Sequence, residues 1–195
     1  ICSMLPIVLA AYRNGTKWGL LTGFVYAVVQ MLLGFKTVSA FFMPSSDSYM
    51  VLWKAICVCL IDYIIAYTVL GFGGIFRNKI KNPSASLCVG SIVALSLRYL
   101  AHIISGYIFF GTWAEWFFSQ DGFALGAKIL EKFSGQGLAL LYSVIYNGLY
   151  MIPEIIITAI VALIIGRVPQ ITGKKSAAKG DIVVCVDFSV FVYIT

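Results

Sequence analysis

Charged residues are scarce in this sequence of 195 residues. Asp, Glu, Lys and Arg make up 11% of it, whereas hydrophobic residues make up 61%; soluble domains carry about 25% charged residues. A soluble domain of this length needs a polar surface, and too few polar residues are present to build one. The composition therefore excludes an ordinary soluble domain and predicts a membrane protein whose surface faces the lipid bilayer.

Residues that commonly ligate metals or perform catalysis are also few. The sequence has one histidine, and its five cysteines show no C-x-x-C spacing, so we interpret the cysteines as small apolar residues. It lacks H-E-x-x-H, a serine nucleophile elbow and closely paired carboxylates, and "GKKS" (173–176) lacks the upstream glycine of a phosphate loop. We expect no metal, no cofactor and no enzymatic activity.

The formal net charge of +6 raises the possibility of nucleic-acid binding. The basic residues, however, lie in short clusters between apolar runs and do not line an aromatic groove. We therefore expect no nucleic-acid partner and interpret the positive charge as a signal of membrane orientation.

Four apolar stretches reach the roughly 20 residues that a membrane-spanning helix requires. They are residues 18–35, 51–76, 86–110 and 138–166. Residues 1–12 are apolar but shorter, and we interpret them as a partial span, either a half-span or the end of a helix cut off upstream. The predicted organisation is an all-α membrane helical bundle over residues 1–168 and a C-terminal tail over residues 169–195.

The connecting segments differ in charge. Residues 13–17, 77–83 and 166–180 contain Arg and Lys with no acid, whereas the alternate segments mix both signs. By the positive-inside rule the first set is cytoplasmic. We therefore predict a multi-pass protein with a cytoplasmic C-terminus.

Polar side chains within the predicted spans lie in the half away from the cytoplasm, on four different helices. They include Tyr26 and Gln30, Asp62, His102, and the group Tyr142, Tyr146 and Asn147. A carboxylate at that depth is costly unless it is paired or faces water, so Asp62 is a candidate functional residue. The alternatives are a structural pair between Asp62 and Arg98, a protonated lone acid, and a histidine that only packs helices; we assign Arg98 no ligand role.

Taken together, Asp62, His102, Tyr142 and Asn147 suit a small polar or cationic organic molecule better than a metal ion. Asn147 lies five residues after Tyr142, a rotation of about 140° on a helix. Either a pocket surrounds this end of the helix, or the helix is irregular near Gly148.

Three further features have open alternatives. Glu154, beside Pro153, either extends the polar site or binds a backbone group freed by the proline. Segment 111–137, with four aromatic residues near its start, forms either an interfacial lid or an aromatic belt. Gly19 and Gly23, in G-x-x-x-G spacing, and "GFGG" (71–74) allow close helix approach, in packing within the chain or with another chain.

Four blocks carry a resemblance to a known family. "LPIVLAAYRNGTKWGLLTGFVYAVVQMLL" (5–33), "LIDYIIAYTVLGFGGIF" (60–76), "RYLAHIISGYIFFG" (98–111) and "LLYSVIYNGLY" (140–150) occur in the family's order. In these blocks the chain resembles the thiamine-specific substrate-binding subunits, or S components, of energy-coupling-factor (ECF) transporters, the ThiT or YuaJ family. The resemblance covers residues from about 4 to 168.

The resemblance implies a six-helix S-component bundle, with the first helix missing here, in a bacterial plasma membrane. It implies that the chain binds thiamine or a close analogue with high affinity on the extracellular side. A separate ECF transmembrane coupling subunit and two ATPase subunits drive uptake in this family. The implied substrate-binding residues are Asp62, His102, Tyr142, Asn147, Tyr26, Phe110, Tyr63, Tyr146 and Gly106.

Three of these positions depart from the family pattern. Asp62 stands where Glu is usual, and Tyr26 and Phe110 stand where Trp is expected. Because phenylalanine offers a weaker cation–π face than tryptophan, the ligand is either thiamine or a precursor or analogue of it. The alternatives from other classes are a structural membrane subunit and a membrane enzyme with Asp62 and His102 as an acid–base pair.

Overall fold

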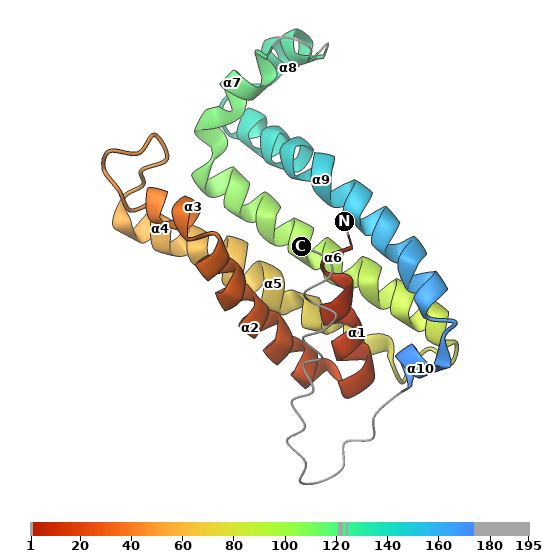
Figure 1. The fold of residues 1–195 in the computed structure, drawn as a ribbon. Helices are drawn as coiled ribbons and strands as arrows, with labels where there is room; N and C mark the ends of the chain where they lie inside the picture. The colour runs from red at the N-terminus through yellow and green to blue at the C-terminus, as the bar shows by residue number, and fades with distance from the viewer. Residues whose placement is uncertain (1, 121–122, 124, 174–195) are drawn as a thin grey trace. The chain divides into compact units, whose positions relative to one another are not determined.

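The computed structural model describes residues 2–120, 123 and 125–173, and in this range the chain is helical with no strand (Figure 1). The prediction of an all-α protein is confirmed. In chain order the elements are α1 (Leu5–Asn14), α2 (Thr16–Leu33), α3 (Phe35–Ala40), α4 (Leu52–Val58), the π-helix η1 (Cys59–Ile65), α5 (Ala66–Thr68), the 3-10 helix η2 (Val69–Phe76), α6 (Pro83–Phe109), the 3-10 turn η3 (Gly111–Trp113), α7 (Ala114–Phe118), α8 (Gly126–Lys132), α9 (Gly135–Ile165) and α10 (Pro169–Thr172).

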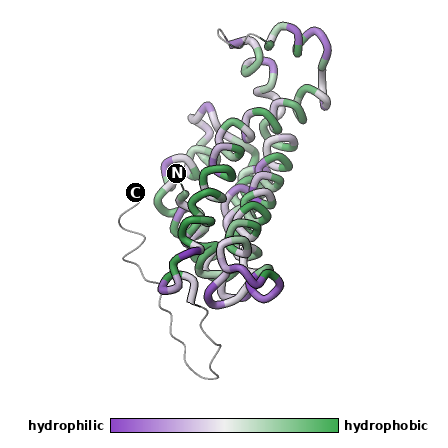
Figure 2. Tube along the Cα trace, turned by 90° about the vertical axis from the view of Figure 1, so that its right-hand side faces the viewer, coloured by the Kyte–Doolittle hydropathy of each residue, from purple (hydrophilic) through white to green (hydrophobic). Residues whose placement is uncertain are grey.

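Within the described residues, four helical stretches are long and apolar enough to cross a membrane. They are Thr16–Leu33, Leu52–Phe76, Pro83–Phe109 and Gly135–Ile165. Figure 2 shows apolar colouring along the long helices and hydrophilic residues mainly in the connecting segments. Large apolar side chains stay exposed on these helices, among them Leu32 at 67%, Leu149 at 63% and Ile164 at 61%. Since such exposure is favourable in lipid rather than in water, the chain is a membrane protein.

The second of these stretches is not a uniform α-helix. It passes from α4 through seven π-helical residues in η1 to α5, and then narrows to the 3-10 helix η2. No glycine or proline lies in η1, whose sequence is CLIDYII, so its widening has no local sequence signal. The π-helical segment carries Asp62.

The contacts divide the chain into two compact units. The first comprises Ile1–Gly23, Thr68–Ser96 and Glu154–Thr195, and the second comprises Phe24–Tyr67 and Leu97–Pro153. All nine residues of the predicted binding set belong to the second unit.

The first unit depends on small residues. An added Cβ on Gly71 would overlap the backbone of Gly19 and Leu20, and one on Gly74 would overlap the carbonyl of Ala11. Lipid is as apolar as leucine, so helices in a membrane associate through close van der Waals packing, which small residues permit. The predicted close approach at Gly19 and at "GFGG" is confirmed, and it serves packing within the chain.

Two local signals define helix ends in the first unit. Gly15 has a φ of 101°, which favours glycine, and it separates α1 from α2. At the start of α6, Pro83 occupies a position that needs no backbone N–H donor, and the Asn82 carboxamide accepts a hydrogen bond from the Ala85 N–H at 3.3 Å.

The second unit contains two apolar clusters. One joins Val38 and Phe41 of the α3 region to Ala55, Val58 and Cys59 of the α4–η1 region. The other joins α7 to the start of α9; its buried members are Ala114, Phe118, Leu138 and Tyr142. Phe110 packs against both clusters, at the end of α6. In Figure 1, α7 and α8 lie beyond the ends of α6 and α9.

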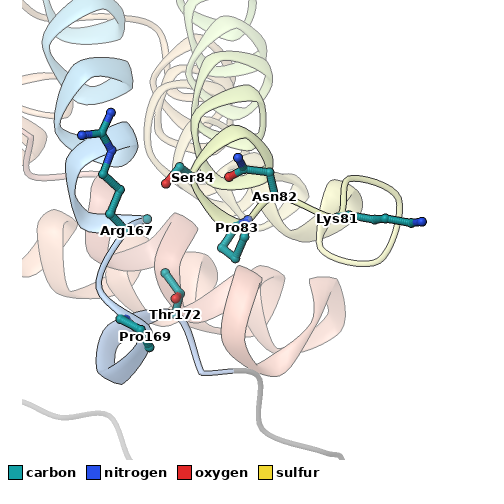
Figure 3. Close-up of a pocket in the computed structure, with 8 residues that line it drawn as sticks. Lys81, Asn82, Pro83, Ser84, Arg167, Pro169 and Thr172 are labelled. Carbon is teal, nitrogen blue, oxygen red and sulfur yellow. The ribbon is translucent and has the colours of Figure 1, made fainter.

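A pocket of about 600 Å³ lies in the first unit, at the start of α6 and the end of α9 (Figure 3). In the close-up, the Lys81 side chain extends away from the other lining residues. The pocket contains no residue of the predicted binding set. Its lining residues are Lys81, Asn82, Pro83, Ser84, Gly166, Arg167, Pro169 and Thr172.

Candidate functional site

Asp62 occupies the middle of the π-helical segment, and 19% of its side chain is exposed. An ionised carboxylate within a membrane span is costly unless other groups compensate its charge. π-Helical segments inside α-helices occur frequently at functional sites because they redirect a side chain. Asp62 is therefore a candidate functional residue by two criteria, its charge within a span and its π-helical position.

Both oxygens of the Asp62 carboxylate have partners on α6. The Oδ1 atom lies 2.8 Å from Nδ1 of His102, and Oδ2 accepts a hydrogen bond from the Ser105 hydroxyl at 2.6 Å. His102 and Ser105 are three residues apart, so they lie on the same helix face. The predicted convergence of Asp62 and His102 is present in the structure. Ser105 was missed, although its spacing from His102 is a usable signal.

Arg98 lies one turn before His102 on α6. Its Nε–H donates a hydrogen bond to Nε2 of His102 at 3.3 Å, and its guanidinium carbon lies 4.4 Å from the ring centroid of Tyr67. Within the described part of the chain, Arg98 makes no direct ion pair with Asp62; the imidazole lies between them. The alternative of a direct Asp62–Arg98 pair is therefore wrong in detail, because the two charges are bridged by His102.

Asn147, on α9, joins this cluster through the backbone of α6. Its Nδ2 atom donates to the His102 carbonyl at 3.3 Å and to the Ser143 carbonyl at 2.8 Å, and its Oδ1 accepts from the Tyr150 hydroxyl. The Tyr150 ring is 6.2 Å from the His102 ring in an edge-on arrangement. Asn147 is 7% exposed, so these bonds satisfy a buried amide.

Gly106 allows α6 and α9 to approach at this point. An added Cβ would overlap the Ser143 hydroxyl and lie 3.2 Å from Nδ2 of Asn147. The Ser143 hydroxyl itself donates to the Ile103 carbonyl at 2.8 Å. Gly106 thus contributes space for the polar contacts of its neighbours.

Tyr142 and Tyr146 lie on another side of α9, against α7. The Phe117 ring is 5.4 Å from the Tyr142 ring and 5.7 Å from the Tyr146 ring. Tyr142 is 7% exposed and Tyr146 is 47% exposed. α9 is continuous through Gly148, so the angular separation of Tyr142 from Asn147 is that of a regular helix. Of the two alternatives for reconciling these positions, an irregularity near Gly148 is therefore absent.

The three other aromatic residues of the predicted binding set, Tyr26, Tyr63 and Phe110, have different neighbours. Tyr26 contacts Tyr67 edge-on at 5.1 Å, and its hydroxyl accepts a hydrogen bond from Gln30 at 2.6 Å. Tyr67 in turn lies beneath the Arg98 guanidinium, so Tyr26 adjoins the polar cluster. Tyr63 packs against the cluster formed by the α3 and α4–η1 regions, and Phe110 contacts Phe41 edge-on at 6.5 Å.

Comparison with known proteins matches residues 1–119 to the family model described as thiamine transporter protein (Thia_YuaJ). The thiamine transporter ThiT of Bacillus subtilis (strain 168) is 30% identical over 167 residues, which cover 81% of this chain and 69% of that protein. The chain belongs to the thiamine transporter protein family. Membership in a transporter family favours a membrane protein without enzymatic activity, and the resemblance found in the sequence is confirmed.

The family match extends over only part of the candidate site. Residues 1–119 include Asp62, His102, Gly106 and the aromatic positions Tyr26 and Phe110. The α9 residues Tyr142, Tyr146 and Asn147 lie beyond it. Their assignment in this member of the thiamine transporter family therefore depends on their contacts with α6 and α7.

The segment that precedes α9 has two aromatic faces. Trp113 and Trp116 are 43% and 57% exposed and contact each other edge-on at 5.8 Å, whereas Phe118 is 1% exposed. Exposed tryptophans are typical of the membrane–water interface, and Phe117 and Phe118 pack toward α9. The exposed tryptophans fit the aromatic-belt interpretation. The face with Phe117 and Phe118, which packs toward α9, fits the lid interpretation.

Glu154 has a different partner from those proposed from the sequence. It belongs to the first unit, in which its Oε1 accepts a hydrogen bond from the Thr158 hydroxyl at 3.4 Å.

The cysteines that the structure describes, Cys2, Cys57, Cys59 and Cys88, have free thiols. Among the described residues no three His, Cys, Asp or Glu side chains gather as a metal site. The predicted tail beyond residue 173 lies outside the described residues.

Proposed function

We propose that this chain is the high-affinity thiamine-binding membrane subunit of an ECF-type vitamin uptake transporter. Its membership in the thiamine transporter protein family supports thiamine as the ligand. The Bacillus subtilis relative is named as a thiamine transporter, which supports the same ligand.

The observation that carries the proposal is the orientation of Asp62. Its carboxylate is held by His102 at 2.8 Å and by Ser105 at 2.6 Å, within a membrane span. Each carboxylate oxygen has a second lone pair, so Asp62 retains acceptor capacity for a donor-bearing ring such as aminopyrimidine. The positive charge of thiamine would offset the carboxylate charge in a site with little water.

Aromatic rings supply the second requirement of a flat cationic ligand. Tyr26, Tyr63 and Phe110 belong to the same unit as Asp62, and so do Tyr142 and Tyr146. A cation over an aromatic face gains about 0.5–2 kcal/mol, and tryptophan is the strongest partner. Tyrosine and phenylalanine at these positions favour a broader ligand range that includes thiamine precursors.

The arrangement of charges in the loops supports extracellular capture. The segments at residues 13–17, 77–83 and 166–173 carry basic residues without acids, which by the positive-inside rule supports a cytoplasmic location for them. We propose a bacterial plasma-membrane location, with the C-terminus in the cytoplasm and the candidate site toward the outside. From the resemblance to ECF transporters we propose that ATP hydrolysis belongs to two partner ATPases joined through a transmembrane coupling subunit, since this sequence has no phosphate-loop motif of its own.

Titration of the natural full-length protein in detergent tests the ligand assignment. Four tryptophans and eleven tyrosines provide intrinsic fluorescence that thiamine binding should quench. We expect saturable quenching with a Kd below about 1 μM, which corresponds to about 8 kcal/mol. Calorimetry on the same sample excludes optical artefacts.

Parallel titrations with an aminopyrimidine precursor and with thiamine phosphate define the ligand range. Tighter binding of the precursor would reassign the ligand within the same class of subunit. Saturation by none of the three compounds would overturn the binding function and favour a structural membrane subunit.

A further inference from the structure

Ser105 is a buried residue of α6 whose hydroxyl donates to a carboxylate on another element. Its side chain is 0% exposed, and the hydroxyl lies 2.6 Å from Oδ2 of Asp62 in η1. A serine inside a helix commonly donates instead to the carbonyl four residues earlier in the same helix. Ser91, which is also on α6 and 1% exposed, does so, with the Leu87 carbonyl as acceptor at 2.9 Å. The hydroxyl of Ser105 therefore joins two elements, whereas that of Ser91 stays within one.

Two contacts fix the plane of the Asp62 carboxylate. The carboxylate of an aspartate turns about a terminal torsion with a broad energy minimum, so a single contact leaves it free to rotate. Here Nδ1 of His102 lies 2.8 Å from Oδ1, and the Ser105 hydroxyl holds Oδ2. Because His102 and Ser105 lie on one face of α6 and hold different oxygens, the carboxylate has a fixed orientation relative to α6.

Ser105 is placed to act on a ligand only through Asp62. A carboxylate has about four lone-pair sites, and the two contacts use one on each oxygen. The Asp62 side chain is 19% exposed, so its remaining lone pairs are accessible, whereas Ser105 is 0% exposed. The Ser105 hydroxyl is thus out of reach of a ligand, and what it controls is the direction of the free lone pairs of Asp62.

We propose that Ser105 is a positioning residue that makes the site specific for a ring with an amino donor. By holding Oδ2, it keeps a free lone pair of Asp62 directed at the amino group of the ligand's pyrimidine ring. This proposal rests on the proposed function, in which Asp62 accepts from an aminopyrimidine. A hydrogen bond weakens steeply when its angle is poor, whereas the attraction between a carboxylate and a positive charge depends on their separation. Ser105 therefore affects recognition of the amino group more than attraction of the cation.

Two ligands that differ by one donor measure this effect. They are thiamine and the analogue in which a hydrogen atom replaces the amino group of the pyrimidine ring. Both carry the same positive charge, but only thiamine donates the hydrogen bond. The wild-type protein should bind thiamine about 10- to 100-fold more tightly than the analogue, as expected for a hydrogen bond to a charged group. In Ser105→Ala this ratio should fall about fivefold, through weaker binding of thiamine with little change for the analogue.

Three further variants separate positioning from a loss of stability. Ser105→Cys keeps a donor of similar shape but weaker strength, so its ratio should lie between those of the wild type and Ser105→Ala. Ser91→Ala is the matched control: it removes an equally buried hydroxyl from the same helix, and its ratio should equal that of the wild type. Asp62→Ala should give the same ratio with or without Ser105→Ala, since no carboxylate remains to be oriented.

Calorimetric titration of the natural full-length protein and its variants in detergent, with both ligands, decides the proposal. A thiamine preference that falls in Ser105→Ala but not in Ser91→Ala supports it. A wild type that binds the two ligands equally overturns it. So does a Ser105→Ala variant in which both affinities fall by the same factor, because that result indicates a structural role only.

The same titrations separate this proposal from the proposed function. If the wild type binds neither ligand, the proposed function fails and this proposal fails with it. If thiamine binds saturably and the ratio is unchanged in Ser105→Ala, only the role of Ser105 is overturned. If Ser105→Ala does not fold, the Ser105→Cys variant decides, and a wild-type ratio in that variant overturns the proposal.

Discussion

At the scale of single residues, the proposed function depends on how the Asp62 carboxylate is compensated within its membrane span. The Asp62 carboxylate contacts His102 through one oxygen and Ser105 through the other, and Arg98 contacts the far ring nitrogen of His102. A carboxylate that pairs directly with arginine is already neutralised. Under the proposed function, the bridged arrangement leaves the Asp62 carboxylate available to a cationic ligand.

The first residue-scale prediction compares two acids within spans. Asp62→Asn should weaken thiamine binding at least tenfold, about 1.4 kcal/mol, since the amide keeps the shape and loses the charge. Glu154→Gln, the matched control, should change binding less than threefold because its contact is with Thr158. Calorimetric titration of both variants checks this. A larger loss in Glu154→Gln would relocate the ligand site.

The second prediction concerns Gly106. Gly106→Ala should lower thermal stability and weaken binding, because its methyl group displaces Ser143 and disturbs Asn147. Overpacking of this kind costs about 1–3 kcal/mol. Gly137→Ala is the control: it meets only Phe133, at 3.9 Å, and alanine is the better helix former. Thermal unfolding in detergent should place the two variants on opposite sides of the wild type, and equal shifts would contradict the argument.

At the scale of elements, α7 is the part of the second unit most directly attached to α9 by aromatic contacts. Phe117 contacts the rings of Tyr142 and Tyr146, and also those of Phe118 and Phe123. Individual aromatic pairs contribute about 0.5–1.5 kcal/mol beyond burial. α7 is short, five residues, so these contacts rather than helix propensity hold it in place.

The element-scale prediction is therefore made for Phe117. Phe117→Ala should weaken thiamine binding about two- to tenfold and speed ligand release, since Tyr142 and Tyr146 lose the ring that orders them. Trp116→Ala is a suitable control because its ring is 57% exposed and contacts Trp113. Stopped-flow fluorescence measures both rates. A stronger effect of Trp116→Ala would favour the exposed face as the ligand contact.

The sequence predicted where the long helices lie, but it did not predict the irregular segment within one of them. Hydropathy identified the long apolar helices, since each residue contributes to it independently of its partners. The π-helical turn at Asp62 was not predictable from CLIDYII, because no glycine or proline marks it. Such a turn is stabilised by contacts from other helices, here those of His102 and Ser105, which lie 40 and 43 residues further along the chain.

At the scale of the whole molecule, orientation in the membrane follows from loop charge. Reporter fusions after Gly173 should be fluorescent with green fluorescent protein and inactive with alkaline phosphatase, because basic segments remain in the cytoplasm. The same reporters inserted in the 43–49 loop should give the opposite result. Active phosphatase at residue 173 would reverse the proposed topology and place the candidate site toward the cytoplasm.

The membrane class, the long helices and the family were determined by the sequence alone, because composition and motif order survive without knowledge of contacts. Most members of the candidate site were also named from it. Their grouping was not: Asp62, His102 and Asn147 adjoin one another through α6, whereas Tyr142 and Tyr146 pack against Phe117. Only the tertiary structure decided this, and with it the contacts of Ser105 and Arg98, because hydrogen bonds between helices depend on the rotation of each helix, which hydropathy leaves undetermined.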